Sequence, residues 1–498
     1  MIRRRTITSY VWNSISGNKM VILSNCIRNF FRKFELLGNS TQGENPAPDN
    51  PQEIKSAGRK SKNLFNIADL RVGQVQKDGT INEKQIYYRT VILDVPQDGK
   101  YRITFNSNDD YTMLYFTEAY ANGAYSNPYI RVHAGNPNYY ITLAKGKNIL
   151  SFSTHTASGN IAFTTDHNIM IAAESETLDY EPYGYLLDVK VTGENLLSNN
   201  PNDWQIGKGI SWSTYPNDAI IIYSVINSAV NVINLKSSNA YSFVNNSGEI
   251  VIKRMIERDS SGKGIKDHDI RSNKYTFVTN QNTTNIILRV DKIDGTELLS
   301  TDIEFIKIML VEGEVNELTP YEPYTEQFVQ IALDEPLRGI GEYKDVLTKD
   351  GVVRKIKRVV LDGSKDEEWR LDRKLENHIN FALVIKGAIT VNTGIRTMMD
   401  KFKYFGAIWN SDLLGQDMFG ATLRINMPKT LATDLQTFKT WLSQNPLTVD
   451  YVLAEPVTEL LPESVPAQLQ ALHTENGTTH VFVDSGEVEA GINIEYKS

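Results

Sequence analysis

Aromatic side chains are concentrated between Tyr101 and Tyr140, where asparagine, aspartate and glycine residues surround them. A sugar ring presents C–H groups to an aromatic face, and its hydroxyl groups need amide or carboxylate partners. The mixture therefore predicts a carbohydrate-binding surface. The candidate residues in this stretch are Asp109, Asp110, Tyr111, Tyr115, Tyr120 and Tyr125.

Trp204 and Trp212 form a second group of candidates for the same chemistry, with Tyr215 close by. The alternative is that many of these rings are core residues or cross-strand pairs, because aromatic residues are common in β-strands. The sequence leaves both interpretations open.

The sequence has no Gly-x-Ser-x-Gly elbow, phosphate-binding loop, His-Glu-x-x-His motif or cysteine pair. Serine hydrolases, nucleotide-binding enzymes and zinc proteases therefore lack their usual sequence support. A glycoside hydrolase needs only two well-placed carboxylates, and Asp109, Asp110, Glu367 and Glu368 are candidates. Solvated acidic loops explain these residues more simply, so we expect no enzymatic activity.

Metal-binding patterns are weak. The seven histidines are scattered, and the single cysteine, Cys26, cannot form a disulfide within the chain. Asp267-His268-Asp269 and Asn108-Asp109-Asp110 offer oxygen ligands for Ca²⁺ but lack the regular spacing of a calcium loop. We expect no cofactor, with calcium as the alternative left open.

The 498 residues are too many for one core and indicate about three domains. The net charge of -8 is spread along the chain without a basic face, which argues against nucleic acid as a partner. The basic start Met1–Arg5 and the apolar run Met20–Ile27 match a signal peptide poorly. No stretch reaches membrane-spanning length, so we expect no membrane insertion.

An internal repeat organises the chain. One unit opens with Asn63-Leu64-Phe65-Asn66 and closes with Tyr180-Glu181-Pro182-Tyr183. The next opens with Asn195-Leu196-Leu197-Ser198 and closes with Tyr321-Glu322-Pro323-Tyr324. Alternation of apolar and polar residues in both units predicts short antiparallel strands and two-sheet, jelly-roll-like packing.

The remaining sequence predicts an N-terminal segment, a polar connector at 38–61 and a C-terminal third that is also rich in strands. That third holds a hairpin with its turn at 348–351, one helix over 431–442 capped by Thr433 and Gln436, and further strands. These strands are expected at 379–387, 402–409, 420–427, 448–454, 478–484 and 490–496. The predicted fold is all-β, in four parts: 1–62, an N-terminal anchoring segment and extended connector; 63–190 and 191–332, two β-sandwich modules; and 333–498, a C-terminal β-rich domain with one packed helix.

Several segments resemble tail and baseplate proteins, including receptor-binding proteins, of phages and prophages of Gram-positive gut bacteria. They are the connector at 38–54, the bracketed modules, Leu333-Asp334-Glu335-Pro336-Leu337-Arg338, Gly351-Val352-Val353-Arg354-Lys355-Ile356, Leu361-Asp362-Gly363-Ser364, Asp400-Lys401-Phe402, Ile408-Trp409-Asn410-Ser411, Phe438 to Pro446 and Tyr451-Val452-Leu453-Ala454-Glu455-Pro456. The resemblance covers residues 36 to 498.

The resemblance implies a virion protein, made in the bacterial host cytoplasm, that forms a homotrimer and displays carbohydrate-binding modules. Its expected partners are other tail or baseplate proteins, contacted through residues 1–62, and host cell-surface polysaccharide. Two alternatives remain: a purely structural baseplate or connector protein without a ligand, and a glycan depolymerase.

Overall fold

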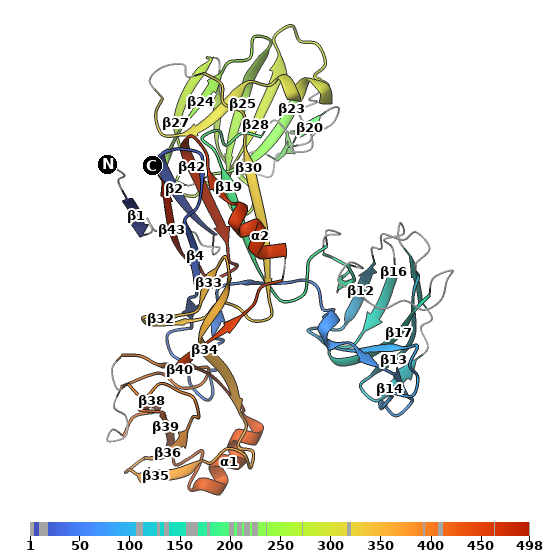
Figure 1. The fold of residues 1–498 in the computed structure, drawn as a ribbon, viewed down its shortest axis with the longest axis vertical. Coiled ribbons are helices and arrows are strands. Elements are labelled where there is room, and N and C mark those ends of the chain that lie inside the picture. The colour runs from blue at the N-terminus through green and yellow to red at the C-terminus, as the bar shows by residue number, and fades with distance from the viewer. Residues whose placement is uncertain are drawn as a thin grey trace.

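The computed structural model is built almost entirely from antiparallel β-strands, which confirms the predicted all-β class (Figure 1). Among the described residues, no helix has the length and apolar character needed to cross a bilayer. The structure describes residues 4–8, 18–105, 113–126, 130–133, 139–155, 168–176, 180–198, 204–206, 212–213, 220–221, 228–235, 237–270, 272–315, 320–391, 394–406, 412–462 and 464–497.

A central sandwich of two sheets holds the described parts together. One sheet has the strand order β1–β43–β4–β33–β34–β40–β37, and the other has the order β2–β42–β19–β30 with β7 added beside β19. The strands are β1 (Arg4–Thr8), β2 (Asn18–Cys26), β4 (Lys33–Leu37), β7 (Arg59–Lys60), β19 (Tyr185–Thr192), β30 (Glu326–Leu333), β33 (Val346–Thr348), β34 (Gly351–Leu361), β37 (Thr397–Met399), β40 (Leu447–Glu459), β42 (Gly477–Asp484) and β43 (Gly491–Lys497).

Both sheets bury alternate apolar residues in one shared core. Leu36 and Ile494 enter it from the first sheet, and Val189 and Val483 enter it from the second. Helix α2 (Ser464–Ala471) adds Val465 and Leu469 to the same core. The strands of this sandwich come from both ends and the middle of the chain.

Three modules are inserted at the ends of hairpins in the central sandwich (Figure 1). Module 1 (61–184) lies between β7 and β19, where Lys60 pairs with Tyr185. Module 2 (193–325) lies between β19 and β30, where Thr192 pairs with Glu326. Module 3 (362–446) lies between β34 and β40, where Leu361 pairs with Leu447, and it returns one strand, β37, to the central sheet beside β40. Modules 1 and 2 therefore leave β19 at its opposite ends.

Modules 1 and 2 share one topology. The sheet β14–β13–β17–β11–β8 of module 1 corresponds strand by strand to β26–β25–β28–β23–β20 of module 2, and β16–β12–β18 corresponds to β27–β24–β29. A β-bulge interrupts the same strand in both, at Phe116/Glu118 in β13 and Ile252/Arg254 in β25. The sequence repeat is therefore a repeat of structure.

The strands of module 1 are β8 (Arg71–Val72), β11 (Arg89–Val95), β12 (Gly99–Thr104), β13 (Met113–Ala121), β14 (Ala124–Ser126), β16 (Tyr139–Leu143), β17 (Gly146–His155) and β18 (Met170–Ala173). Those of module 2 are β20 (Trp204–Ile206), β23 (Ser228–Asn234), β24 (Ala240–Asn245), β25 (Ile250–Arg258), β26 (Gly264–Asp269), β27 (Lys274–Val278), β28 (Asn285–Lys292) and β29 (Ile308–Glu312). Shorter elements are β3 (Asn29–Phe30), β5 (Ser40–Thr41), β6 (Lys55–Ser56), η1 (Ile67–Asp69), β9 (Gln74–Val75), β10 (Ile81–Asn82), β15 (Ile130–His133), β21 (Trp212–Ser213), β22 (Ile220–Ile221), η4 (Ser300–Phe305), β31 (Gly339–Ile340), β32 (Tyr343–Lys344) and β41 (His473–Thr474).

One buried asparagine closes each module. The Asn63 amide oxygen accepts the N–H groups of Phe65 and Ile171 at 2.9 and 3.1 Å, and its amide nitrogen donates to the carbonyls of Ile169 and Glu181, both at 3.0 Å.

Asn195 repeats this pattern in module 2. It accepts from Leu197 and Leu310 and donates to the Glu322 carbonyl at 3.0 Å. The opening and closing sequence signatures therefore meet in space at one amide side chain.

Module 3 packs a helix on a sheet of order β35–β36–β39–β38. These strands are β35 (Arg370–Lys374), β36 (His378–Val384), β38 (Gly415–Phe419) and β39 (Thr422–Pro428). Helix α1 (Leu435–Gln444) places Phe438 on Phe381 with ring centroids 4.0 Å apart. The strands expected near 379–387, 420–427, 448–454, 478–484 and 490–496 are confirmed as β36, β39, β40, β42 and β43.

Some expectations need correction. Residues 18–60 do not form a separate segment and connector, because β2 pairs with β42 and β4 pairs with β33 and β43. The helix cap is Asp434 with Thr437 in place of Thr433 with Gln436, and α2 was not expected. At 402–406 the structure has an isolated bridge at Tyr404 where a strand was expected, and 407–409 lie outside the described residues.

Candidate functional site

Tyr120 and Tyr125 form a cross-strand pair in module 1. They lie directly opposite each other on β13 and β14, and both side chains are half-buried. The connecting turn has positive φ at Asn122 and Gly123, 49° and 83°, as a two-residue hairpin turn requires. This turn brings two of the candidate tyrosines together.

Gly79 packs closely against Tyr120. A Cβ atom at Gly79 would lie 2.6 Å from Cε1 of the Tyr120 ring, and the glycine has φ +82°. Only glycine fits this position without displacing the ring. One part of the tyrosine surface is therefore taken by the turn that precedes β10.

Tyr115 lies further along the same strand. Its backbone is in register with Arg131 of β15 and with Ser153 of β17. Trp212 lies on β21 opposite Ile221 of β22. Asp109, Asp110 and Tyr111 lie outside the described residues. The structure thus brings Tyr115, Tyr120 and Tyr125 onto two neighbouring strands, β13 and β14.

Trp204 is a core residue, contrary to the expectation that it binds a ligand. It is 5% exposed and belongs to the apolar core of module 2. Its indole N–H donates to the Ser198 carbonyl at 2.8 Å, which satisfies its one polar group. Neither the ring face nor the N–H is available to a sugar.

The loop at 83–88 exposes an aromatic residue that is not among the binding residues predicted from the sequence. Tyr87 and Ile86 are each 61% exposed, and the Arg89 guanidinium donates to the carbonyls of Ile86 and Tyr88. Val72, opposite Arg89 on β8, is 44% exposed. The available signal was an apolar run, Ile86-Tyr87-Tyr88, directly after a polar turn.

Module 2 carries ion pairs where module 1 carries uncharged or acidic residues. Arg254, the first residue after the bulge, corresponds to Glu118 and pairs with Asp267 on β26. Arg289 lies opposite Arg254, corresponds to Ser151 and pairs with Asp291 at 3.0 Å. The two copies of the module therefore present different chemistry on corresponding strands.

A buried polar network lies inside module 2. The His268 ring nitrogens lie 2.6 Å from the Glu257 carboxylate and 2.8 Å from the Tyr275 hydroxyl. Asn280 N–H and the Thr283 hydroxyl donate to the other Glu257 oxygen at 2.6 and 2.5 Å. Burial raises the pKa of Glu257, but these hydrogen bonds outweigh it and leave the pKa below the usual glutamate value.

The calcium alternative finds no support among the described residues. No group of three or more histidine, cysteine, aspartate or glutamate residues there is arranged to hold a metal ion. In Asp267-His268-Asp269, Asp267 pairs with Arg254 and His268 contacts Glu257. Asp109 and Asp110 lie outside the described residues.

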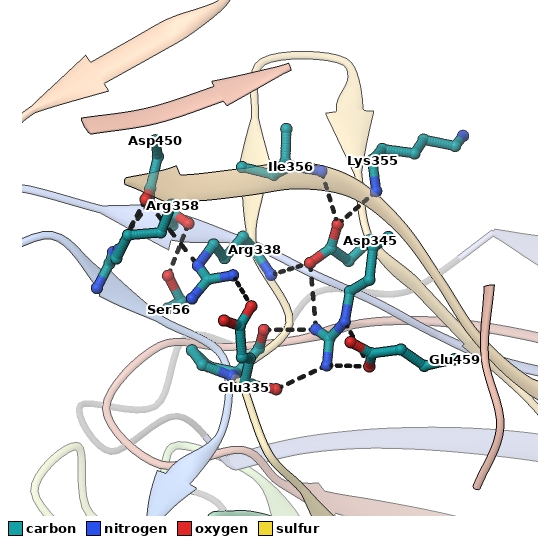
Figure 2. A network of polar contacts seen from close by, with 12 residues as sticks. Ser56, Glu335, Arg338, Asp345, Lys355, Ile356, Arg358, Asp450 and Glu459 are labelled. Atoms are coloured by element: carbon teal, nitrogen blue, oxygen red, sulfur yellow. Dashed lines mark hydrogen bonds and ion pairs between the residues drawn. The ribbon is translucent and has the colours of Figure 1, made fainter. Parts of the chain in front are cut away.

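Arginines and carboxylates alternate in a second network, beside β34 of the central sandwich (Figure 2). One oxygen of buried Asp345 accepts the N–H groups of Lys355 and Ile356 at 2.7 and 3.0 Å, and the other accepts from Arg338 N–H. Arg354 lies 3.3 Å from Asp345 and 2.8 Å from Glu459. Burial raises the pKa of Asp345, and the backbone donors partly offset this.

This network stabilises a β-bulge in β34. The register of β34 against β40 shifts between Arg354 and Ile356, where Asp345 supplies the missing backbone partner. Glu367, a candidate glycosidase carboxylate, accepts from the N–H groups of Asp362 and Gly363 and from the Trp369 indole. Glu367 therefore stabilises the loop that runs from Asp362 to Trp369.

No protein-family model matches the chain, and no curated protein matches it. Among solved structures, the arabinofuranosyltransferase AftD from Mycobacteria is 9% identical, with a TM-score of 0.13, over 82% of this chain and 32% of its own. The infectious bursal disease virus VP2 subviral particle is 7% identical, with a TM-score of 0.10, over 99% of this chain and 84% of its own. The chain thus spans about a third of the glycosyltransferase's length, and with TM-scores this low neither structure bears on its function.

Proposed function

We propose that the chain is a non-catalytic virion tail or baseplate protein that displays module 1 for binding to host-surface glycan. The observation that carries the proposal is the insertion of two copies of one module at opposite ends of β19, each through a single pair of chain crossings. In Figure 1 modules 1 and 2 project from the central sandwich in different directions. A display protein needs modules that project in this way.

Module 1 is the better candidate for the binding module. Its β13–β14 hairpin pairs Tyr120 with Tyr125, and the backbone of Tyr115 lies further back on β13. Tyrosine combines an apolar face with a hydroxyl group. In module 2 the corresponding strands carry arginine–aspartate pairs that already satisfy one another. Several copies on one particle, as in the expected homotrimer, would strengthen weak single-site binding by avidity.

A purely structural role is the second candidate, and the burial of Trp204 favours it for module 2. Under this hypothesis the modules pack only against neighbouring particle proteins. Residues 18–60 then support the central sandwich itself, and contacts with other tail proteins come from other surfaces.

Glycan binding by the full chain tests the proposal. Tyr115→Ala with Tyr120→Ala should reduce binding to a glycan array or to host cell-wall polysaccharide at least about tenfold, because each lost ring contact costs roughly 1 kcal/mol. Arg254→Ala with Arg289→Ala changes the corresponding strands of module 2 and should leave binding unchanged.

Unfolding temperatures of both variants show whether the modules remain folded. Absence of glycan binding by the unmodified chain, or equal losses in the two double variants, would contradict the proposal and favour the structural role. Release of reducing sugar from the glycan would instead indicate a depolymerase.

A further inference from the structure

A buried arginine lies where module 3 meets the central sandwich. Arg396 directly precedes β37, which pairs with β40 of the central sheet, and its guanidinium Nη2 donates to the Met418 carbonyl of β38. Beside it, the Thr397 hydroxyl donates to the side-chain oxygen of Gln416, also on β38, at 2.6 Å. Polar side chains therefore link β37 of the central sheet to β38 of module 3.

The Arg396 guanidinium lacks a negative partner. The residue is 2% exposed, and within the described part of the chain its Nε and Nη1 atoms have no hydrogen-bond partner. The Met418 carbonyl, which accepts from Nη2, is uncharged. Asp417, the one carboxylate of β38, pairs with Arg424 at 3.8 Å. Because a guanidinium stays protonated, the charge of Arg396 is buried without compensation among the described residues.

Two other buried arginines have a carboxylate partner. Arg338 is 3% exposed and lies 2.6 Å from Glu335. Arg354 is 4% exposed and lies 3.3 Å from Asp345. Burial of an unpaired charge is strongly unfavourable, whereas hydrogen-bonded carboxylates offset much of the lost hydration. Arg396 therefore has the donors of such a pair but not the anion.

The exposed neighbours of Arg396 place it close to solvent. Gly394 and Ile395, which precede it in the chain, are both exposed, Ile395 at 49%. Phe405 is 48% exposed and donates its N–H to the Gln416 carbonyl at 3.0 Å, so the β38 side of the contact also borders the surface. A group of a few atoms can reach the guanidinium after a small displacement of neighbouring side chains.

We propose that Arg396 binds an oxyanion, the carboxylate or phosphate group of a small ligand, through Nε and Nη1 at the contact between β37 and β38. Hydrogen bonds from a guanidinium to such groups are charge-assisted and stronger than those between neutral groups. The bound anion compensates the buried charge and stabilises the contact between module 3 and the central sandwich. This inference is independent of glycan binding by module 1.

Hydrogen exchange of the full chain tests anion binding. The probes are inorganic phosphate and glucuronate, which carries a carboxylate on a sugar ring, and both are titrated at fixed ionic strength. A ligand that binds only the folded state raises protection by the factor 1 + [L]/Kd, so peptides of β37 and β38 should gain about fivefold at four times Kd. A gain with either probe supports the proposal, and the comparison distinguishes phosphate from carboxylate.

Arg396→Met keeps an unbranched side chain and removes its charge. This variant should show no gain with either probe. Without a probe, its β37 and β38 peptides should be at least as protected as in the unmodified chain, because an uncompensated buried charge has been replaced by an apolar group. The matched control, Arg354→Met, leaves buried Asp345 without its counter-charge and should lose at least about tenfold protection in β34.

No gain in protection with either probe would overturn the proposal, and this measurement needs no variant. Equal gains in the unmodified chain and in Arg396→Met would also overturn it, because they would come from nonspecific effects of the anions. So would a loss of protection in Arg396→Met without a probe, since it would assign Arg396 to structural support through the Met418 carbonyl.

Discussion

Asn63 and Asn195 show how one side chain can define a module boundary. Each buried amide accepts one backbone N–H near the start of its module and one from the module's last strand, β18 or β29. The repeated Asn-Leu signature is therefore a structural requirement of closure. It carries no information about a ligand.

Replacing either asparagine with alanine should destabilise only its own module. Asn63→Ala leaves the buried N–H groups of Phe65 and Ile171 without an acceptor, at a cost of about 2–3 kcal/mol. Peptide-resolved hydrogen exchange should show lost protection in module 1 for Asn63→Ala and in module 2 for Asn195→Ala. Equal losses in both modules would contradict the closure role.

Glu257 should make module 2 sensitive to acid. Because its folded pKa lies below the unfolded value, the ionised carboxylate adds stability above the unfolded pKa, and this stability is lost as pH falls through the folded pKa. Glu257→Gln should therefore destabilise module 2 by about 1–3 kcal/mol near pH 7.

Urea unfolding followed by hydrogen exchange measures this difference. The two proteins should converge only as pH falls through the folded pKa, which lies below the usual glutamate value, because the wild-type carboxyl then becomes uncharged as well. If Glu257→Gln remains equally destabilising at low pH, the lost stability would come from the altered shape of the side chain and not from its lost charge.

At the residue scale, a local pattern indicated one arrangement among the candidate residues and gave no signal for another. The Asn122-Gly123 turn was a readable signal for the Tyr120–Tyr125 pair, since such turns place the flanking residues opposite each other. The burial of Trp204 was not readable, because aromatic residues at strand positions serve cores and surfaces equally well.

At the element scale, helix α1 shows the limit of a local pattern. Its apolar spacing predicted the helix, and Phe438 and Leu442 are buried as that spacing requires. Thr433–Gln436 and Asp434–Thr437 both have capping-box spacing, so spacing alone cannot choose between them. The structure uses Asp434, which accepts the Thr437 N–H at 2.8 Å.

Two alanine substitutions distinguish between the two possible N-terminal caps of helix α1. Asp434→Ala should cost about 1 kcal/mol, because an acceptor for the first helical turn is lost. Thr433→Ala should have little effect, since Thr433 contributes its backbone N–H to Thr437. Peptide-resolved hydrogen exchange of helix α1 compares them. Equal effects would contradict the assignment.

The strands of residues 18–60 could not be placed from sequence. β2 pairs with β42 and β4 pairs with β43, partners more than 400 positions away along the chain. Local alternation predicts that a strand forms, but it does not identify a distant partner.

At the scale of the whole molecule, the repeat located the modules but misplaced their edges. The expected boundaries after 190 and 332 assign β19 and β30 to the modules, whereas these strands pair with each other in the central sandwich. The Asn-Leu and Tyr-Glu-Pro-Tyr signatures mark where each module closes, and β19 and β30 lie just outside the residues that these signatures enclose. Only the sheet pairing shows that they belong to another core.

Removal of module 1 should leave the central sandwich folded. Replacing residues 62–183 by a short glycine-containing turn joins β7 to β19, which are already antiparallel neighbours at Lys60 and Tyr185. Hydrogen-exchange protection of β19, β30 and β42 should match the full chain. Loss of that protection would show that module 1 is part of the sandwich's folding unit.

The position of β19 also decides how the protein carries mechanical load. Module 1 enters this eight-residue strand at Tyr185 and module 2 leaves it at Thr192. Tension between the two modules therefore runs along a covalent backbone and does not depend on hydrogen bonds between strands. A pull that separates module 2 from β30 instead peels the hairpin, beginning at Thr192 and Glu326, one ladder bond after another.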